Sequence, residues 1–185
     1  MTLQEVITKR RSVSPLMFTD EAISKDTIQV LLELANWAPT HRKTEPWRFK
    51  IIAGQSKAEL GEFLAKKYKE TTAKFSKFKY NSIKSKVEKS PVVIAICMQR
   101  DLKETVPEWE EIAATAMAVQ NLWLSATNLG LSGYWSSPAL IQYMDEFFNL
   151  NEGERCLGFF YLGYLKGPKP EREPNPIHEK VEWFE

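Results

Sequence analysis

The hydrophobic pattern between residues 109 and 130 predicts one long central helix. Ala, Leu and Met dominate this segment, and no Pro or Gly interrupts it before Gly130. At 1.5 Å per residue the helix would be roughly 30 Å long, about the diameter of a small domain. Its apolar residues fill two faces, so we expect it to be buried. The third face is a stripe of small or polar residues that lets another helix approach closely, from the same chain or from a second copy. The stripe consists of Glu110, Ala114, Ala118, Asn121, Ser125 and Asn128.

Shorter helices are predicted where apolar residues recur every three or four positions behind a capping residue. Four such helices are predicted. One covers residues 2–10, and a second begins after a Ser24 cap. A third begins at a capping box of Ser56 and Glu59, and a fourth begins at Ser137-Pro138. Strands are predicted where β-branched and aromatic residues gather. They cover residues 47–52, 91–98, 131–137 and 156–164, and the run 91–98 is apolar enough to be buried on both faces. No repeat or linker divides the chain, so we expect a single domain over residues 1–185.

The segment from Lys66 to Lys89 is unusually basic, with nine lysines against two glutamates. Four aromatic residues are interleaved with them: Tyr68, Phe75, Phe78 and Tyr80. Basic residues mixed with aromatics are compatible with a nucleic-acid surface. Lysine is common on exposed helices, however, and we favour a solvated helical segment whose aromatic side chains pack underneath.

The C-terminal segment 166–185 combines prolines with an apolar end. Pro168, Pro170, Pro174 and Pro176 disfavour regular structure, whereas Val181, Trp183 and Phe184 favour burial. We therefore expect an arm that reaches across to a partner subunit.

Composition narrows the function classes. A net charge of +1 gives no general case for binding nucleic acid or a membrane, and polar residues inside the long helix argue against a membrane span. Cys97 and Cys156 lie far apart in apolar runs and are interpreted as buried thiols in a reducing cytoplasm. The N-terminus lacks the apolar core of a signal peptide. With only two histidines besides these cysteines, we expect no metal site.

No catalytic set of side chains stands out, but three segments are candidates for ligand binding. Arg10-Arg11-Ser12 at a helix end has the groups that hold a phosphate through charge-assisted hydrogen bonds. The loop 38–47 is flanked by Trp37 and Trp47, which would either stack on a planar ligand or belong to the core. The turn 130–137 contains the sequence Gly-Leu-Ser-Gly.

Taken in this order and spacing, the three segments resemble the nitroreductase family of FMN-dependent oxidoreductases. The resemblance extends over almost the whole chain, including the Ala-Pro…Glu-Pro-Trp-Arg-Phe segment, the central helix and the terminal strand 158–163. It implies an α+β fold with a central mixed β-sheet flanked by helices. It also implies a homodimer in which each domain embraces the other and FMN occupies clefts at the interface.

The resemblance also implies roles for particular residues. Arg10 and Ser12 would bind the FMN phosphate, with Arg11 near the same end of the cofactor. Trp37 and His41 would approach the flavin from the other subunit, and Lys43 would lie beside the pyrimidine end of the ring. The isoalloxazine edge would be lined by Trp135, Ser136 and Ser137.

Three positions depart from the family pattern. Glu45 stands where members usually have Gln, Lys43 where Asn or Ser is frequent, and Pro138 where Gly is common. The substitution by Pro138 removes a backbone donor expected near the flavin. These departures affect the electronics of the site and its substrate preference rather than the fold.

The implied activity is a ping-pong reaction in which NADH or NADPH passes a hydride to flavin N5. A nitroaromatic, a quinone or a similar small aromatic acceptor then takes the electrons. The flavin carries the chemistry, so no catalytic side chain is expected. Two alternatives remain open: another flavin chemistry on the same fold, such as flavin destruction or reductive dehalogenation, and a non-enzymatic flavin-binding redox sensor. A nucleic-acid-binding module is a more distant third.

Overall fold

A four-stranded sheet forms the middle layer of the protein, in a computed structural model that describes all residues 1–185. The strands are β1 Trp47–Ile52, β2 Val92–Gln99, β3 Ser132–Ser136 and β4 Glu154–Gly163, in the spatial order β1-β2-β4-β3. As predicted, β2 is buried on both faces, with only its last residue partly exposed. The β-branched run suits this position, because each of its side chains contacts one of two apolar layers.

The sheet was expected to be mixed, but its strands pair only in antiparallel fashion. The one parallel pairing is an isolated bridge between Ser12 and Gly133, which joins the N-terminal segment to the edge of β3. This contact cannot extend far into a ladder, because Pro15 follows closely and lacks a backbone N–H. The N-terminal segment is therefore fixed to β3 at one point, directly after Arg10 and Arg11.

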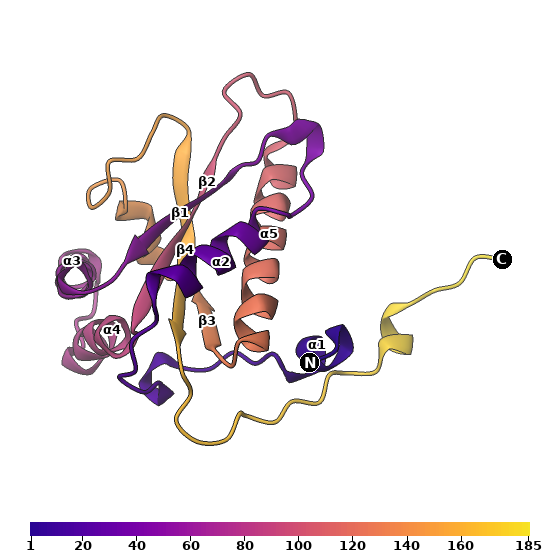
Figure 1. Cartoon of the computed structure of the whole chain (residues 1–185). Coiled ribbons are helices and arrows are strands. Elements are labelled where there is room, and N and C mark those ends of the chain that lie inside the picture. The colour runs from indigo at the N-terminus through magenta and orange to yellow at the C-terminus, as the bar shows by residue number, and fades with distance from the viewer.

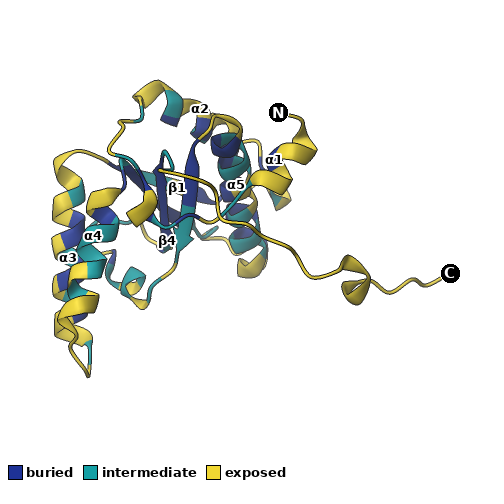
Figure 2. Cartoon of the chain, turned by 90° about the horizontal axis from the view of Figure 1, so that it is seen from below, coloured by how far each residue is buried: buried dark blue, intermediate teal, exposed yellow.

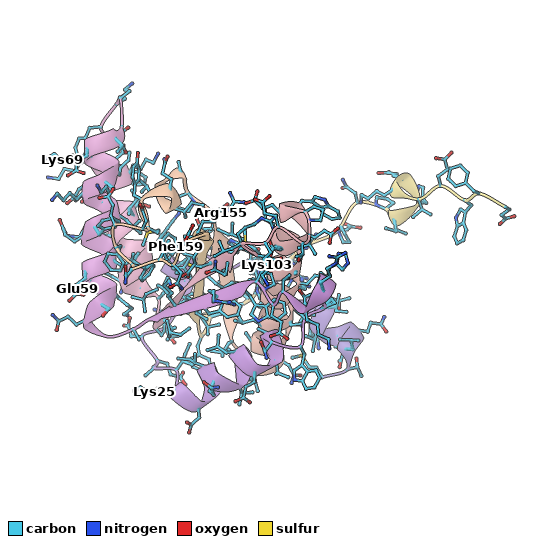
Figure 3. The ribbon with its side chains drawn as sticks, turned by 90° about the horizontal axis from the view of Figure 1, so that it is seen from above. Lys25, Glu59, Lys69, Lys103, Arg155 and Phe159 are labelled. Atoms are coloured by element: carbon cyan, nitrogen blue, oxygen red, sulfur yellow. The ribbon has the colours of Figure 1, made fainter.

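Helices cover both faces of the sheet (Figure 1). The helices are α1 Leu3–Lys9, α2 Lys25–Ala35, α3 Gln55–Thr71, α4 Lys77–Lys89 and α5 Glu108–Asn128. One apolar core lies between the sheet and the pair α2 and α5, and a second lies between the sheet and the pair α3 and α4. Figure 3 shows Phe159, which is fully buried, inside the molecule, whereas Lys25, Glu59 and Lys69 lie at its periphery. The α+β class expected from the sequence is confirmed.

Local signals at the helix ends were partly correct. Ser24 caps α2 by accepting a hydrogen bond from the Thr27 N–H at 3.0 Å, as predicted. The capping box expected at Ser56 is wrong, because α3 already begins at Gln55. Its start is set instead by Gly54, whose φ of 57° allows the sharp turn out of β1.

The helix expected after Ser137 is only a short 3-10 turn, η3 Ala139–Tyr143. The apolar side chains of this segment still pack against the α3/α4 core, and Met144 is fully buried there. The segment is thus held by burial rather than by a continuous helix, and it closes one side of the region beyond β3.

Part of the small-residue stripe of α5 is used within the chain. Ala114 and Ala118 are buried in the core shared with α2, which packs closely along α5. Trp109 and Met117 on another side of the helix are exposed, at 67% and 40%. The stripe itself therefore does not require a second copy, and part of the apolar surface of α5 remains exposed.

The segment 166–185 leaves the body of the molecule and is exposed along its length (Figure 2). It is irregular apart from one short turn, η4 Ile177–Lys180, as its prolines predicted. Trp183 and Phe184 are more than four-fifths exposed. None of the helices of the protein is long and apolar enough to span a membrane.

Candidate functional site

The tripeptide Arg10-Arg11-Ser12 is fixed between α1 and the edge of β3. A capping box formed by Thr2 and Glu5 starts α1, and the helix ends at Arg10. Three residues later the Val13 N–H donates to the Gly133 carbonyl at 3.0 Å. Gly133 has no side chain where one would collide, since a Cβ there would lie 2.2 Å from Cζ of Phe160. The end of α1 and the hydrogen bond to Gly133 therefore place the two arginines and the serine beside the first residues of β3.

The two arginines have different surroundings. The guanidinium of Arg10 lies over the ring of Trp123 on α5, 4.5 Å from the ring centroid. Arg11 instead ties down the C-terminal segment, because its Nε donates to the Pro170 carbonyl at 2.8 Å. It also donates to the Thr8 carbonyl at 2.6 Å. Arg11 thus connects α1 to the beginning of the tail.

This connection brings positive charges together, with Glu171 and Glu173 nearby in the hollow that Arg11 and Arg172 line. Burial lowers the pKa of Arg10, and the neighbouring charges of Arg172 and Arg11 lower it further. The pKa of Lys169 is lowered for the same reasons, burial first and then the charge of Arg11. Arg10, Arg11, Lys169 and Arg172 form no salt bridge, and we call these four residues the cation cluster. Like charges held together in this way favour binding of an anion.

Two buried polar groups beside the cation cluster also lack partners. They are the hydroxyl of Ser132, at the start of β3, and the indole N–H of Trp123, beneath Arg10. A buried donor without a hydrogen bond costs free energy, of the order of 1–3 kcal/mol. Such groups are frequently found where a ligand or an ordered water completes the structure.

A cavity of about 340 Å³ lies further along β3, between α3, α4 and η3. Ser136 and Pro138 form its β3 side, and three polar residues of α4 approach from the opposite side: Lys79, Ser82 and Lys86. Its remaining lining is largely apolar and includes Tyr161, whose pKa is raised by burial. The volume lies in the range of small-molecule sites, in which a few polar groups orient a ligand against apolar walls.

The cavity and the cation cluster share one edge of the sheet. Ser136 lies three residues along β3 from Gly133, about 10 Å at 3.3 Å per residue. The cavity opens on the α3/α4 side of β3, whereas Arg10 packs on Trp123 on the α5 side, so a ligand that contacts both places must pass around this edge strand.

Of the three residues expected at the isoalloxazine edge, only Ser136 lines the cavity. Trp135 points to the opposite face of the sheet, as alternation along a strand requires, and packs on the α2/α5 core. Its indole Nε1 fills the space above Gly158, where a Cβ would approach it to 2.3 Å. Ser137 lies exposed just beyond the strand.

The remaining candidates lie at the other end of α5. Nδ1 of His41 is 2.5 Å from Oε2 of Glu110, in the first turn of α5. Trp37 is 83% exposed, and Lys43 is exposed as well. Glu110 and Trp123, the contacts of His41 and Arg10, are thirteen residues apart on α5. At 1.5 Å per residue this separation is about 20 Å, so one chain does not bring the two groups of candidates together.

The loop that carries His41 is conformationally strained. Arg42, Lys43 and Glu45 all have positive φ values, of 51°, 56° and 42°. Residues other than glycine rarely adopt this conformation, and such strain concentrates at functional sites. The loop is anchored from within by the Thr40 hydroxyl, which accepts a hydrogen bond from the Glu45 N–H at 3.2 Å.

Several residues of the site were missed from the sequence. Lys79, Ser82 and Lys86 were assigned to a solvated surface, although their spacing places them on one side of a helix. Lys169 and Arg172 were hidden among the prolines and glutamates of the tail. The aromatic residues of the basic segment were expected to pack underneath it, which holds for Tyr68 but is wrong for Phe78, whose exposure is 85%.

The chain is similar to proteins of a known class of enzyme. Residues 7–164 match the model of the Nitroreductase family, so the chain belongs to this family of oxidoreductases.

Individual relatives match over nearly their full length. A Bacillus subtilis (strain 168) protein that carries the provisional name NAD(P)H nitroreductase YfhC is 28% identical, over 96% of this chain and 92% of its own. The crystal structure of a nitroreductase-like family protein from Bacillus cereus is 30% identical with a TM-score of 0.82, covering 100% of this chain and 97% of that one. The FMN-dependent nitroreductase NfnB from Mycobacterium smegmatis, solved in complex with NADPH, shares the fold with a TM-score of 0.78 at 15% identity. That match covers 98% of this chain and 97% of NfnB.

Proposed function

We propose that the protein is an FMN-dependent NAD(P)H oxidoreductase that reduces nitroaromatics, quinones or similar small aromatic acceptors by a ping-pong reaction. The observation that carries this proposal is the cation cluster, four positive side chains that form no salt bridge, at the sheet edge that also borders a cavity of about 340 Å³. Membership of the nitroreductase family supports it, as does the binding of FMN and NADPH by the M. smegmatis protein of the same fold.

The donors of the cation cluster suit a phosphate monoester. Arginine binds phosphate oxygens through paired N–H groups, and the Ser12 hydroxyl adds a neutral donor. The pKa of Arg10 is lowered by burial first and by the charges of Arg172 and Arg11 second, and a dianionic phosphate would offset both effects. Arg10, Ser12, Lys169 and Arg172 would therefore hold the FMN phosphate, and Arg11 would support it by keeping the tail in place.

The cavity beyond Ser136 suits the ring end of the same cofactor. Its apolar lining would cover a planar ring, and Ser136 and Ser82 would hydrogen-bond to its polar edge. The ammonium groups of Lys79 and Lys86 would stabilise negative charge on the ring system. Bound FMN would supply the redox chemistry, taking a hydride at N5 from NADH or NADPH and delivering electrons to the acceptor.

We further propose that the active form is a homodimer in which Trp37, His41 and Lys43 come from the partner subunit. Two observations support it. The candidates of one chain lie in two groups about 20 Å apart along α5. Several exposed apolar side chains also surround α5, and an exposed apolar surface of this kind is typical of an interaction site. They are Leu3, Val30, Leu34, Trp37, Met117 and Leu129.

The dimer is tested by substitution of one residue of this apolar surface. Met117→Glu should give the mass of one chain, 21.4 kDa, in light scattering, whereas the wild type should give twice that mass. Met17→Glu is the matched control, since Met17 is 39% exposed but lies outside α5. A wild-type protein that is monomeric while saturated with FMN would contradict the proposed assembly.

The activity is tested in two steps. The absorption spectrum of the purified protein should contain flavin bands, and anaerobic mixing with NADH or NADPH should bleach them at a rate compatible with turnover. Reoxidation by a panel of nitroaromatics and quinones then identifies the acceptor class. A bound flavin that neither nicotinamide reduces would favour the redox sensor, and loss of flavin itself during turnover would favour flavin destruction.

We place the protein in the cytoplasm, a location supported by its two free, buried thiols.

A further inference from the structure

The two cysteines of the chain, distant in sequence, face each other across the sheet. Cys97 on β2 and Cys156 on β4 are register partners in the antiparallel ladder. Both are free and buried, and both belong to the core on the α3/α4 side. Their side chains therefore lie on the same face of two neighbouring strands.

Hydrogen bonding in the ladder shows how closely they face each other. The Arg100 N–H donates to the Gly153 carbonyl at 2.9 Å, which makes this pair a hydrogen-bonded one. Pairs alternate along an antiparallel ladder, so Cys97 and Cys156 form a non-hydrogen-bonded pair. Facing Cα atoms at such positions are about 4.5 Å apart, within the range of roughly 4.4–6.8 Å that disulfides span. A β-bulge directly beyond the pair, where the register shifts between Ile96 and Cys97, adds local twist.

Cys156 is the more accessible of the two cysteines, 6% exposed against 0% for Cys97. Cys156 lines a cavity of about 510 Å³ between β4 and η3 with the residues that follow it, together with Gln142 and Asp145. Cys97 lies behind it, with no exposed surface. This cavity shares no lining residue with the one beside Ser136, so it is separate from the proposed flavin site.

The contact between the two thiols affects them in opposite ways, whereas the nearby charges act alike on both. A hydrogen bond from the Cys97 thiol lowers the pKa of Cys156 despite its burial, and the same contact raises the pKa of Cys97. The ammonium group of Lys50 lowers the pKa of both thiols, while Glu154, its partner at 2.7 Å, opposes it. The accessible cysteine is thus the one that ionises more readily, and the thiolate is the reactive form.

We propose that Cys156 and Cys97 are a redox-active dithiol, in which a hydroperoxide entering the cavity oxidises Cys156 and Cys97 then closes an intramolecular disulfide. The Cys156 thiolate attacks the peroxide, the O–O bond breaks, and an alcohol or water leaves with a proton from solvent, giving a sulfenic acid. The Cys97 thiol attacks that sulfur, the S–S bond forms, and the hydroxyl leaves as water with the Cys97 proton. Two thiols thereby lose two electrons to one peroxide.

The wild-type holoprotein provides the first test, because the chain has no other cysteine. After treatment with hydrogen peroxide, unfolding in N-ethylmaleimide should find both thiols lost together and the intact mass lighter by two hydrogen atoms. A non-reducing peptide map should contain the Cys97 and Cys156 peptides joined, and a dithiol reductant should restore both thiols. Thiols that stay free in the folded protein would overturn the proposal. Oxidation of Cys156 to a sulfinic acid without a disulfide, or a disulfide between two chains, would overturn it equally.

Variants test the order of the two steps. Cys97→Ala should stop at a Cys156 that reacts with dimedone, whereas Cys156→Ala should leave Cys97 unmodified by peroxide. Lys50→Met should slow the peroxide reaction several-fold, and Lys103→Met, at an exposed position, should not. A Cys97 that reacts in the absence of Cys156 as fast as the wild type would reverse the assignment. Should either alanine variant fail to fold, the wild-type mass measurement still decides between a disulfide and free thiols.

Discussion

Replacing Arg10 by glutamine should weaken FMN binding without destabilising the apoprotein. Two small effects on the folded apoprotein oppose each other. The variant loses the contact of the guanidinium with the Trp123 ring at 4.5 Å, worth about 0.5–1 kcal/mol at an exposed site. It also loses the repulsion from Arg11 and Arg172, which in water is worth up to about 1 kcal/mol. The free energy of unfolding of the apoprotein should therefore change by less than about 1 kcal/mol.

The effect on FMN affinity has no such compensation. A hydrogen bond to a charged group contributes roughly 1.5–3 kcal/mol, which corresponds to a Kd about tenfold to a hundredfold higher. At an FMN concentration of about 100 times the wild-type Kd, the cofactor stabilises the wild type by about 2.7 kcal/mol. A Kd thirty times higher would leave about 0.9 kcal/mol of that stabilisation, so most of the thermal shift caused by FMN should disappear.

Fluorescence titration of apoprotein with FMN measures the affinity, and thermal unfolding with and without FMN measures the stabilisation. Lys103→Gln is the control for loss of one positive charge at an exposed position outside the cation cluster. The wild-type Kd should also rise with ionic strength more steeply than that of Arg10→Gln. An Arg10→Gln protein that binds FMN as tightly as the wild type would refute the assignment of the phosphate to this cluster.

Three further substitutions examine other parts of the structure. Lys43→Met should lower the two-electron midpoint potential of the flavin, because a cation beside the ring stabilises the reduced form; a change below about 10 mV, roughly 0.5 kcal/mol, would place the lysine in solvent. Gly133→Ala should destabilise the protein by about 1–3 kcal/mol in urea unfolding, since the new methyl group collides with the Phe160 ring, and an unchanged midpoint would contradict the packing. Glu154→Gln concerns pH. Burial works against ionisation of Glu154, but hydrogen bonds from Lys50 and Asn151 hold its pKa below the usual value. It therefore stabilises the fold above its unfolded-state pKa of about 4.3, and this contribution is lost as the pH falls through the lower folded-state pKa. Glu154→Gln should reduce the dependence of the free energy of unfolding on pH in the acid range. An unchanged slope would show that Glu154 does not contribute to this dependence.

The sequence predicts those elements that are determined by their own side chains or by contacts between residues close in sequence. The run Val92–Met98 is apolar throughout and rich in β-branched residues, and it becomes a central strand, while the cap at Ser24 is a contact between residues three apart. The start of α3 was misplaced because Gly54 sets it through a backbone conformation, and a pattern of side chains does not report that conformation.

The candidate site is less visible in the sequence, because its parts meet only after folding. Arg10 and Arg11 stand out as a motif, but Arg172 joins them through a tail whose path depends on the Pro170 carbonyl. The two cysteines are 59 residues apart, and their approach follows from the register of β2 with β4. Neither the position of Arg172 nor the pairing of the two cysteines can be predicted from composition or spacing.

The distance between the two groups of site residues along α5 has a consequence for mixtures of variants. In the proposed dimer each flavin takes Arg10 from one chain and His41 from the other. Two variants, one altered at each position, would each be impaired at both flavin sites when purified separately. Mixed and refolded together, they would form heterodimers in which both alterations fall on one flavin and the second flavin has only native residues. With random association about a quarter of all sites would be restored. Two defective copies of this chain would thus complement each other in one cell.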